Sequence, residues 1–188
     1  MDNSVFPLRS LWLCGEKWAC FLCVFLVLGF LSCNRQKVDS RSLVEESPVA
    51  ASTVSMAGAR FSSQLVSGFY PVEEQSWRWT ARQFVVALRT PPGAAQSGAT
   101  LELDLYLPSL VIDKLKTLTL SANVNGAVLA PETWSQSGKY VYKRPVPAEA
   151  LTADAVQARF SLDKALPPEG QEERELGIVV MSAGLNAQ

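Results

Sequence analysis

The chain has 188 residues, with 17 basic and 18 acidic side chains and no histidine. The lack of histidine excludes imidazole base catalysis and histidine metal ligands, and the interspersed, nearly balanced charges argue against a basic nucleic-acid-binding face. We therefore expect no nucleic-acid partner, no metal and no cofactor.

The first predicted element is a hydrophobic N-terminal segment, residues 1–33, that is either a signal peptide or a membrane anchor. An uncharged run from Trp18 to Ser32 follows two basic residues and ends at Cys33. Fifteen helical residues rise about 22 Å, which is short for a bilayer core of about 30 Å. A cleaved signal segment is therefore favoured. The alternative is an uncleaved anchor that extends further towards the N-terminus.

A small residue followed by Cys33, the last of the chain's four cysteines, resembles the processing site of bacterial lipoprotein signal peptides. The resemblance implies that Cys33 carries the lipid and that the rest of the chain is exported and membrane-anchored at the cell envelope. The Cys-x-x-Cys pair within the apolar run has no further ligand pair nearby, so we do not interpret it as a metal or redox site.

Residues 34–67 are predicted to form a flexible linker. Aromatic residues are absent there apart from Phe61, and no hydrophobic period persists. Such a segment buries too little apolar area to offset its ordering entropy. A short helix near residues 52–64 is the only element that we consider in it. The folded domain is placed at residues 68–188, which is long enough for one core and too short for two.

Alternation of apolar and polar residues over seven positions predicts half-buried antiparallel strands, and nearly continuous apolar runs predict central strands. The strands expected from these patterns are residues 84–88, 101–107, 118–124, 140–144, 156–162 and 176–181.

Turn residues separate these strands. Asn125-Gly126 predicts a tight hairpin, because both positions of such a turn need positive φ. A short helix is expected over residues 109–115. Short strands joined by turns rich in proline and glycine predict an all-β fold, an antiparallel two-sheet β-sandwich with six to nine strands.

Aromatic side chains are the best candidates for a binding site, since flat amphipathic rings suit a half-wet contact such as stacking on a sugar. Trp134, Tyr140 and Tyr142 form the predicted ligand-binding cluster, with Trp134 expected on an exposed loop. Trp77 and Trp79 stand two apart on an extended segment and face the same side. Trp79 is expected to be a structural residue of the core.

No residue is predicted to be catalytic. The chain lacks a G-x-S-x-G elbow and a phosphate-binding glycine loop. Glutamate pairs at 73–74 and 172–173 are adjacent in sequence and expected to be solvated. Asp163 and Arg174 are expected to be structural and to pair across one end of the sheet, and Arg78 is expected to pair with a glutamate of the 73–74 pair.

An opening and a closing set of motifs resemble those of a known family. The opening set is Gly68-Phe69-Tyr70-Pro71 with Trp77-Arg78-Trp79-Thr80, and the closing set is Arg174-Glu175-Leu176-Gly177. These sets are similar to those of the jelly-roll-like accessory domains of bacterial glycosyltransferases and envelope polysaccharide proteins. The resemblance covers residues 68–185. It implies a jelly-roll-like β-sandwich in a carbohydrate-linked setting, and no reaction.

These observations lead to three functional hypotheses. The favoured one is a non-catalytic envelope lipoprotein that displays a β-sandwich and binds or organises glycan. The alternative is a structural or protein-interaction subunit of an envelope complex with no sugar affinity, for example one that binds a partner by edge-strand addition. An enzyme with paired carboxylates is the least favoured.

Overall fold

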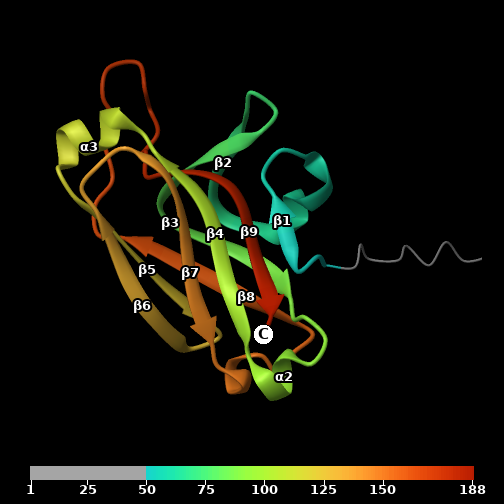
Figure 1. Ribbon diagram of the computed structural model, residues 1–188. Helices are drawn as coiled ribbons and strands as arrows, with labels where there is room; N and C mark the ends of the chain where they lie inside the picture. Colours follow the sequence, from blue (N-terminus) through green and yellow to red (C-terminus); the bar gives the residue numbers. More distant parts are fainter. Residues whose placement is uncertain (1–49) are drawn as a thin grey trace, which may run out of the picture. The chain divides into compact units, whose positions relative to one another are not determined.

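The computed structural model describes residues 50–188, so the predicted signal peptide or anchor, the predicted lipid attachment site Cys33 and residues 34–49 of the predicted linker lie outside it. The described residues are dominated by antiparallel strands (Figure 1). In chain order the elements are β1 (Thr53–Ser55), η2 (Ala59–Gln64), β2 (Leu65–Glu73), β3 (Trp77–Arg89), α2 (Ala94–Ser97), β4 (Ala99–Leu107), α3 (Ser109–Leu115), β5 (Leu118–Val124), β6 (Ala127–Trp134), β7 (Gly138–Val146), η3 (Ala148–Ala150), β8 (Ala155–Leu162) and β9 (Val179–Ala187).

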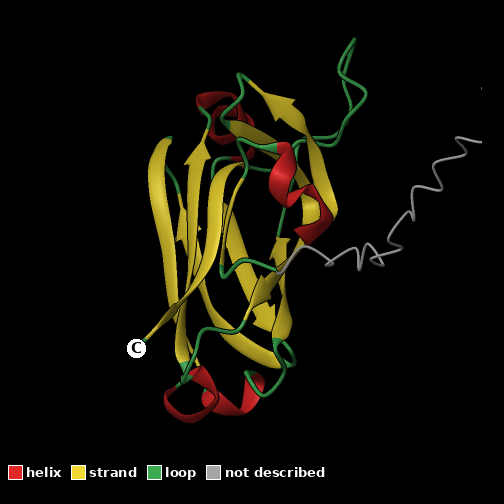
Figure 2. Cartoon of the chain, turned by 90° about the vertical axis from the view of Figure 1, so that its right-hand side faces the viewer, coloured by secondary structure: helices red, strands yellow, loops and turns green. Residues whose placement is uncertain are grey.

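The strands form one hydrogen-bonded sheet in the order β6-β5-β8-β3-β9-β4-β7, with β1 beside β9 and β2 beside β3. The sheet folds over at β3, because residues 83–89 pair with β8 whereas Arg78 and Trp79 pair with β9. We call β6-β5-β8-β3-β2 the β8 layer and β7-β4-β9-β1 the β4 layer. Figure 2 shows the strands edge-on, with α2 and η3 at one end. The predicted antiparallel two-sheet β-sandwich is confirmed.

Alternation along the strands builds the core between the layers. In β4, Leu101, Leu103, Leu105 and Leu107 are buried, and the residues between them are more exposed. The rings of Phe84 in β3 and Phe160 in β8 stack with centroids 4.9 Å apart. Fully burying one such side chain contributes about 1.5–3 kcal/mol, so the alternating strands supply the main stabilisation of the fold.

The predicted turn and helix are also present. Asn125 and Gly126 have φ values of 46° and 96° and join β5 to β6 as a tight hairpin. The helix α3 covers the predicted range, Ser109–Leu115, and buries Val111 and Ile112. Local turn chemistry and helical periodicity therefore predicted both connections.

The last strand lies later in the chain than expected. It covers Val179–Ala187, whereas the apolar pattern favoured residues 176–181. Leu176 instead forms an isolated bridge with Leu166, and both side chains are buried. This bridge closes the connection between β8 and β9, so its apolar residues pack inward without belonging to the strand.

The predicted boundary between linker and domain at residues 67 and 68 is corrected by the structure. The segment before residue 68 supplies β1, η2 and the start of β2, and Val54 and Met56 are completely buried. The buried Gln64 side chain donates to the carbonyl oxygens of Ala51 and Ala87, at 3.0 and 2.7 Å. The sequence pattern missed this because β1 has only three residues, too few to show a period.

Gly68 explains how β2 accommodates the irregular middle of β3. Its φ is +76°, and a Cβ atom there would lie 2.0 Å from the carbonyl oxygen of Gln83. The register between the two strands shifts on both sides of this position. Only glycine fits such a close backbone approach at positive φ, so the glycine of the first motif serves the fold.

No helix within residues 50–188 is long and apolar enough to cross a membrane.

Candidate ligand-binding faces

The predicted ligand-binding cluster is largely buried. Trp134 lies at the end of β6, not in a loop, and is 6 % exposed. Its ring packs against the half-buried ring of Tyr140, with centroids 5.3 Å apart. Tyr142 is completely buried. The expected exposed loop at Trp134 is therefore wrong, because Trp134 belongs to β6 and pairs with the buried Leu118 of β5, beyond a shift in the register of the two strands.

Tyr142 of β7 does not face solvent but connects β7 to β6 through its hydroxyl group. Its hydroxyl donates to the carbonyl oxygen of Ala130 at 2.9 Å, and burial raises the pKa of Tyr142. The guanidinium of Arg144 stacks over this ring at 4.7 Å and donates to the carbonyl oxygens of Ala130 and Pro131. Arg144 also pairs with Glu132 at 2.9 Å. These side chains occupy backbone acceptors on the β6 edge and so protect it from strand addition.

The predicted ion pairs at the sheet ends are replaced by others. Asp163 accepts a hydrogen bond from the backbone N–H of Thr119 at 2.7 Å and does not pair with Arg174. Arg78 donates to the carbonyl oxygens of Met56 and Tyr70. Both predicted pairings are therefore wrong, because strand order brings other groups to these positions.

Arg174 holds two carboxylates at one end of the sandwich. It pairs with Glu172 at 2.7 Å and with Glu73 at 2.8 Å, and its guanidinium lies over the ring of Tyr70. The hydrogen bonds from Arg174 lower the pKa of Glu172 to about 2. A general acid of a glycosidase needs a raised pKa, so Glu172 is poorly suited to that role. Residues 50–188 contain no cluster of carboxylates arranged to hold a metal ion.

An aromatic row crosses the outer face of the β4 layer. The register places Lys139 of β7, Tyr106 of β4, Val179 of β9 and Trp79 of β3 side by side. Directly opposed residues of antiparallel strands project to the same face, so these side chains share it. Tyr106 is 37 % exposed. Trp79 is half-buried and only packs partly against the core, so the prediction that it is a core residue is wrong, because its position on β3 projects to the outer face.

Trp77 extends this row. As the two-residue spacing predicted, it lies on the same side of β3 as Trp79, and the two rings make an edge-to-face contact with centroids 6.3 Å apart. Both rings are only half-buried. Two strand spacings separate Tyr106 from Trp79, roughly 10 Å. We call Lys139, Tyr106, Val179, Trp79 and Trp77 the aromatic row.

Polar side chains lie next to the aromatic row. Ser182 of β9 donates to the carboxylate of Asp104 in β4 at 2.5 Å, and Val141 of β7, 55 % exposed, is on the other side of Asp104. One row further, Lys143 and Glu102 form an ion pair. On this face Glu102 and Lys143 neutralise each other, whereas the carboxylate of Asp104 has a hydroxyl partner, beside an apolar aromatic edge.

The outer face of the β8 layer is different. It carries a hollow of about 310 Å³ over β3, β5 and β8, lined in part by Gln83, Ser121, Arg159 and Ser161. A second hollow, of about 360 Å³, adjoins the hairpin at Gly126 and shares Asn123 and Arg159 with the first. Hydroxyl, amide and guanidinium groups line the two hollows, and the first is also lined by the aliphatic Val85 and Val128 and by Phe160.

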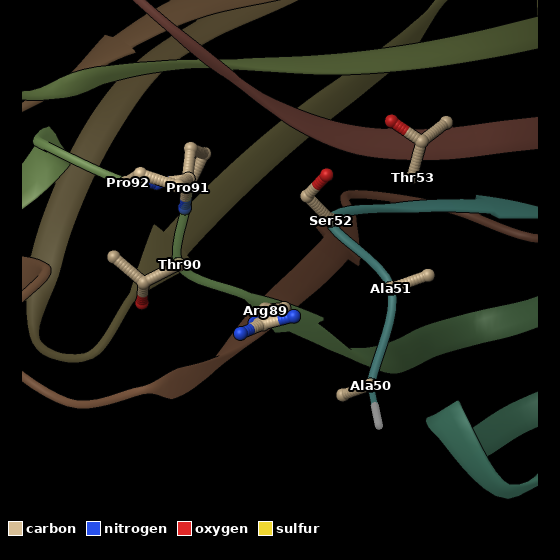
Figure 3. A pocket seen from close by; sticks show the side chains of 8 residues that line it. All are labelled: Ala50, Ala51, Ser52, Thr53, Arg89, Thr90, Pro91 and Pro92. Carbon is tan, nitrogen blue, oxygen red and sulfur yellow. The ribbon is translucent and has the colours of Figure 1, made fainter. Parts of the chain in front are cut away.

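A third depression, of about 500 Å³, is lined by residues 50–53 and 89–92 (Figure 3). A hydrogen bond from the backbone N–H of Arg89 to the carbonyl oxygen of Ala51 joins its two walls. Arg89 is its only charged side chain among the described residues. Its wall begins at Ala50, the first residue that the structure describes.

Comparisons with known proteins concern the fold. No family model and no curated protein matches the chain. Similar solved structures include a carbohydrate-binding module with specific mannan recognition, which is 13% identical with a TM-score of 0.42 over 74% of this chain and 98% of that one.

Other similar structures are parts of larger chains. A carbohydrate-binding module with neighbouring domains from Clostridium perfringens, solved with GlcNAc, is 12% identical with a TM-score of 0.36 over 73% of this chain and 28% of that one. An acetyl xylan esterase from the rumen bacterium Butyrivibrio proteoclasticus is 10% identical with a TM-score of 0.38 over 71% of this chain and 31% of that one. At these identities the similarity concerns the fold alone.

Sequence reasoning did not select Tyr106 or Arg159 as site residues. A usable signal was present, because both occupy outward positions of strongly alternating strands, where an aromatic or cationic side chain is not needed by the core. The burial of Trp134 and Tyr142 could not be predicted in the same way, since it depends on how β6 meets β7.

Proposed function

We propose that this protein is a non-catalytic, membrane-anchored envelope lipoprotein whose β-sandwich binds glycan on the outer face of the β4 layer. The observation that carries the binding proposal is the aromatic row, which brings half-exposed rings from β3 and β4 onto one face. Cys33 is the proposed lipid attachment site that would hold the protein at the membrane.

The chemistry of the face suits a sugar chain. A sugar ring has a C–H face that packs on an aromatic ring and a rim of hydroxyls that need hydrogen-bond partners. The rings of Tyr106 and Trp77 supply the first, and Lys139 with the Asp104 carboxylate supplies the second. The roughly 10 Å between Tyr106 and Trp79 is room for a short oligosaccharide and not only a single ring.

The test is glycan-array binding of the full chain in mild detergent, followed by affinity measurements on the best neutral oligosaccharide. Tyr106→Ala and Trp77→Ala should each lower the affinity at least tenfold, since each removes one stacking ring. Val128→Ala is the matched control, because Val128 is 81 % exposed on the opposite layer. Unchanged affinity in both aromatic variants, or no glycan bound by the wild type, would contradict the proposal.

A protein-interaction subunit is the alternative, and the edge strand β2 favours it. This nine-residue strand exposes Val66 and Val72 and pairs only with β3. However, its register shifts repeatedly and Pro71 offers no N–H group, which makes it a poor template for strand addition. If this alternative is correct, Val66→Lys abolishes capture of a partner from envelope extract and Tyr106→Ala does not.

The anchoring part of the proposal has its own test. Cys33→Ala should abolish acylation and leave an unprocessed precursor, because the thiol that accepts the lipid is gone. Intact-mass spectrometry of the membrane fraction measures this. The same membrane-bound mass for both proteins would show that the lipid proposal is wrong, without bearing on glycan binding.

A further inference from the structure

We propose a second ligand site, on the outer face of the β8 layer, in which Arg159 binds the carboxylate of an acidic polysaccharide. This site lies on the opposite layer from the aromatic row and does not depend on it. Three observations lead to it: the position of Arg159, the lack of a carboxylate around it, and the hollows on both sides.

Arg159 stands in the middle of the face. The register places it between Asn123 of β5 and Val85 of β3, with Val128 of β6 beyond Asn123. Its side chain is exposed, and one Nη2 proton is donated to the amide oxygen of Gln157 at 2.8 Å. This contact holds one edge of the guanidinium and leaves its other N–H groups free of partners within residues 50–188.

No carboxylate neutralises this arginine. The neighbouring outward positions on β3, β5 and β8 are amide, hydroxyl or aliphatic residues, and Arg159 forms no ion pair with the part of the chain that the structure describes. The next acidic residue along β8 is Asp163, four positions away or roughly 13 Å. Its carboxylate already accepts a hydrogen bond from Thr119. The β8 face thus carries an unpaired cation at its centre.

The surroundings of Arg159 match a sugar rather than a bare ion. The hollow towards β3 presents Gln83, Ser121 and Ser161, whose side-chain polar atoms have no hydrogen-bond partner among residues 50–188. The hollow on the other side presents Asn123, whose amide oxygen accepts from Gly126 and whose amide N–H groups remain free. A chain crossing both hollows would place hydroxyls over these groups.

The guanidinium selects the charge of the ligand. Its planar fork matches a carboxylate with two parallel N–H···O bonds, and such charge-assisted bonds are about twice as strong as neutral ones. A uronic acid unit has both features that the face offers to bind, a carboxylate and a rim of hydroxyls. The ligand class assigned to this face is therefore a carboxylate-bearing polysaccharide.

The test measures binding of the full chain in mild detergent to polygalacturonate by calorimetry, with fully methyl-esterified polygalacturonate as the uncharged form of the same polymer. We expect binding to the acid form only. Arg159→Gln should weaken it at least tenfold, and Arg159→Lys should recover part of the loss. Arg60→Gln is the matched control, since it removes an equal charge from an exposed arginine of η2. Equal melting temperatures show that each variant remains folded.

Several results would overturn the proposal. These are equal binding of the esterified polymer, an unchanged affinity in Arg159→Gln, an equal loss in Arg60→Gln, or no binding of the acid polymer at all. Binding of dextran sulfate with the same affinity and the same Arg159 dependence would refute carboxylate selection. Tyr106→Ala should leave polygalacturonate binding unchanged, so failure of this site and failure of the aromatic row are distinguishable.

Discussion

The outer faces of the two layers are built from the same alternating strands, and yet their charged side chains have different partners. On the β4 layer, Glu102 pairs with Lys143 and Asp104 with Ser182, beside the aromatic row. On the β8 layer, Arg159 has an amide for its partner and no carboxylate. Alternation fixes which residues face the core and leaves the outward positions free. The outward residues are therefore where the two faces acquire different chemistry.

The largest expected effect concerns the common core that supports both faces. A fragment of residues 68–188 lacks β1, η2 and the start of β2, and with them the buried Val54, Met56 and Gln64. We expect it to lose cooperative unfolding, whereas residues 50–188 melt cooperatively and without any effect of reductant, having no cysteine. Circular dichroism melts of the two fragments decide this. A cooperative melt of the shorter fragment at the same temperature would show that the folded domain begins at residue 68, as the sequence predicted.

The next effect concerns the core between the faces. Trp134→Ala removes a large buried ring from the end of β6 and should cost about 3–5 kcal/mol of unfolding free energy, the usual range for such a deletion. Denaturant melts measure the loss, and Val128→Ala on the same strand is the control, expected within about 0.5 kcal/mol. A loss below about 1 kcal/mol would mean that Trp134 is exposed in solution.

A smaller effect is expected when Arg159 is given a carboxylate partner, so that the charges of the β8 face are paired like Glu102 and Lys143 on the β4 layer. Val85 lies directly opposite Arg159, so Val85→Glu places a carboxylate where the β8 face has none. The new ion pair should lower polygalacturonate affinity about tenfold and leave neutral-glycan binding at the aromatic row unchanged. Val85→Gln is the matched control, with the same shape and no charge. An equal loss in both variants would point to steric obstruction.

The smallest effect concerns the ion pair between Glu102 and Lys143 on the outer face of the β4 layer. A double-mutant cycle on Glu102 and Lys143 should give a coupling of about 0.2–1 kcal/mol, because both side chains are substantially solvated. Unfolding free energies of Glu102→Gln, Lys143→Gln and the double variant supply the cycle. Coupling should fall in high salt, and a value that does not change with salt would argue against a simple surface ion pair.

The sequence predicted the fold better than the site. Period-two patterns located β4, β5 and β8 within one or two residues, and Asn125-Gly126 located the hairpin, because both signals are local. The aromatic row depends on Trp79 and Tyr106 meeting through β9, between residues far apart in the chain. No local pattern contains that register, and this is why Trp134 was selected instead.

The pairing of β3 has a consequence for the order of folding. Val86 in β3 pairs with Ala158, 72 positions later, and Trp79 pairs with Val179, 100 positions later. Until those residues are available, β3 has only the bulged β2 as a partner, and the apolar side of this hairpin has no opposing layer. Long-range pairing of this kind slows folding and leaves incomplete chains prone to aggregation. We therefore expect a chain still being synthesised to remain open until β9 emerges, and to depend on protection by a chaperone up to that moment.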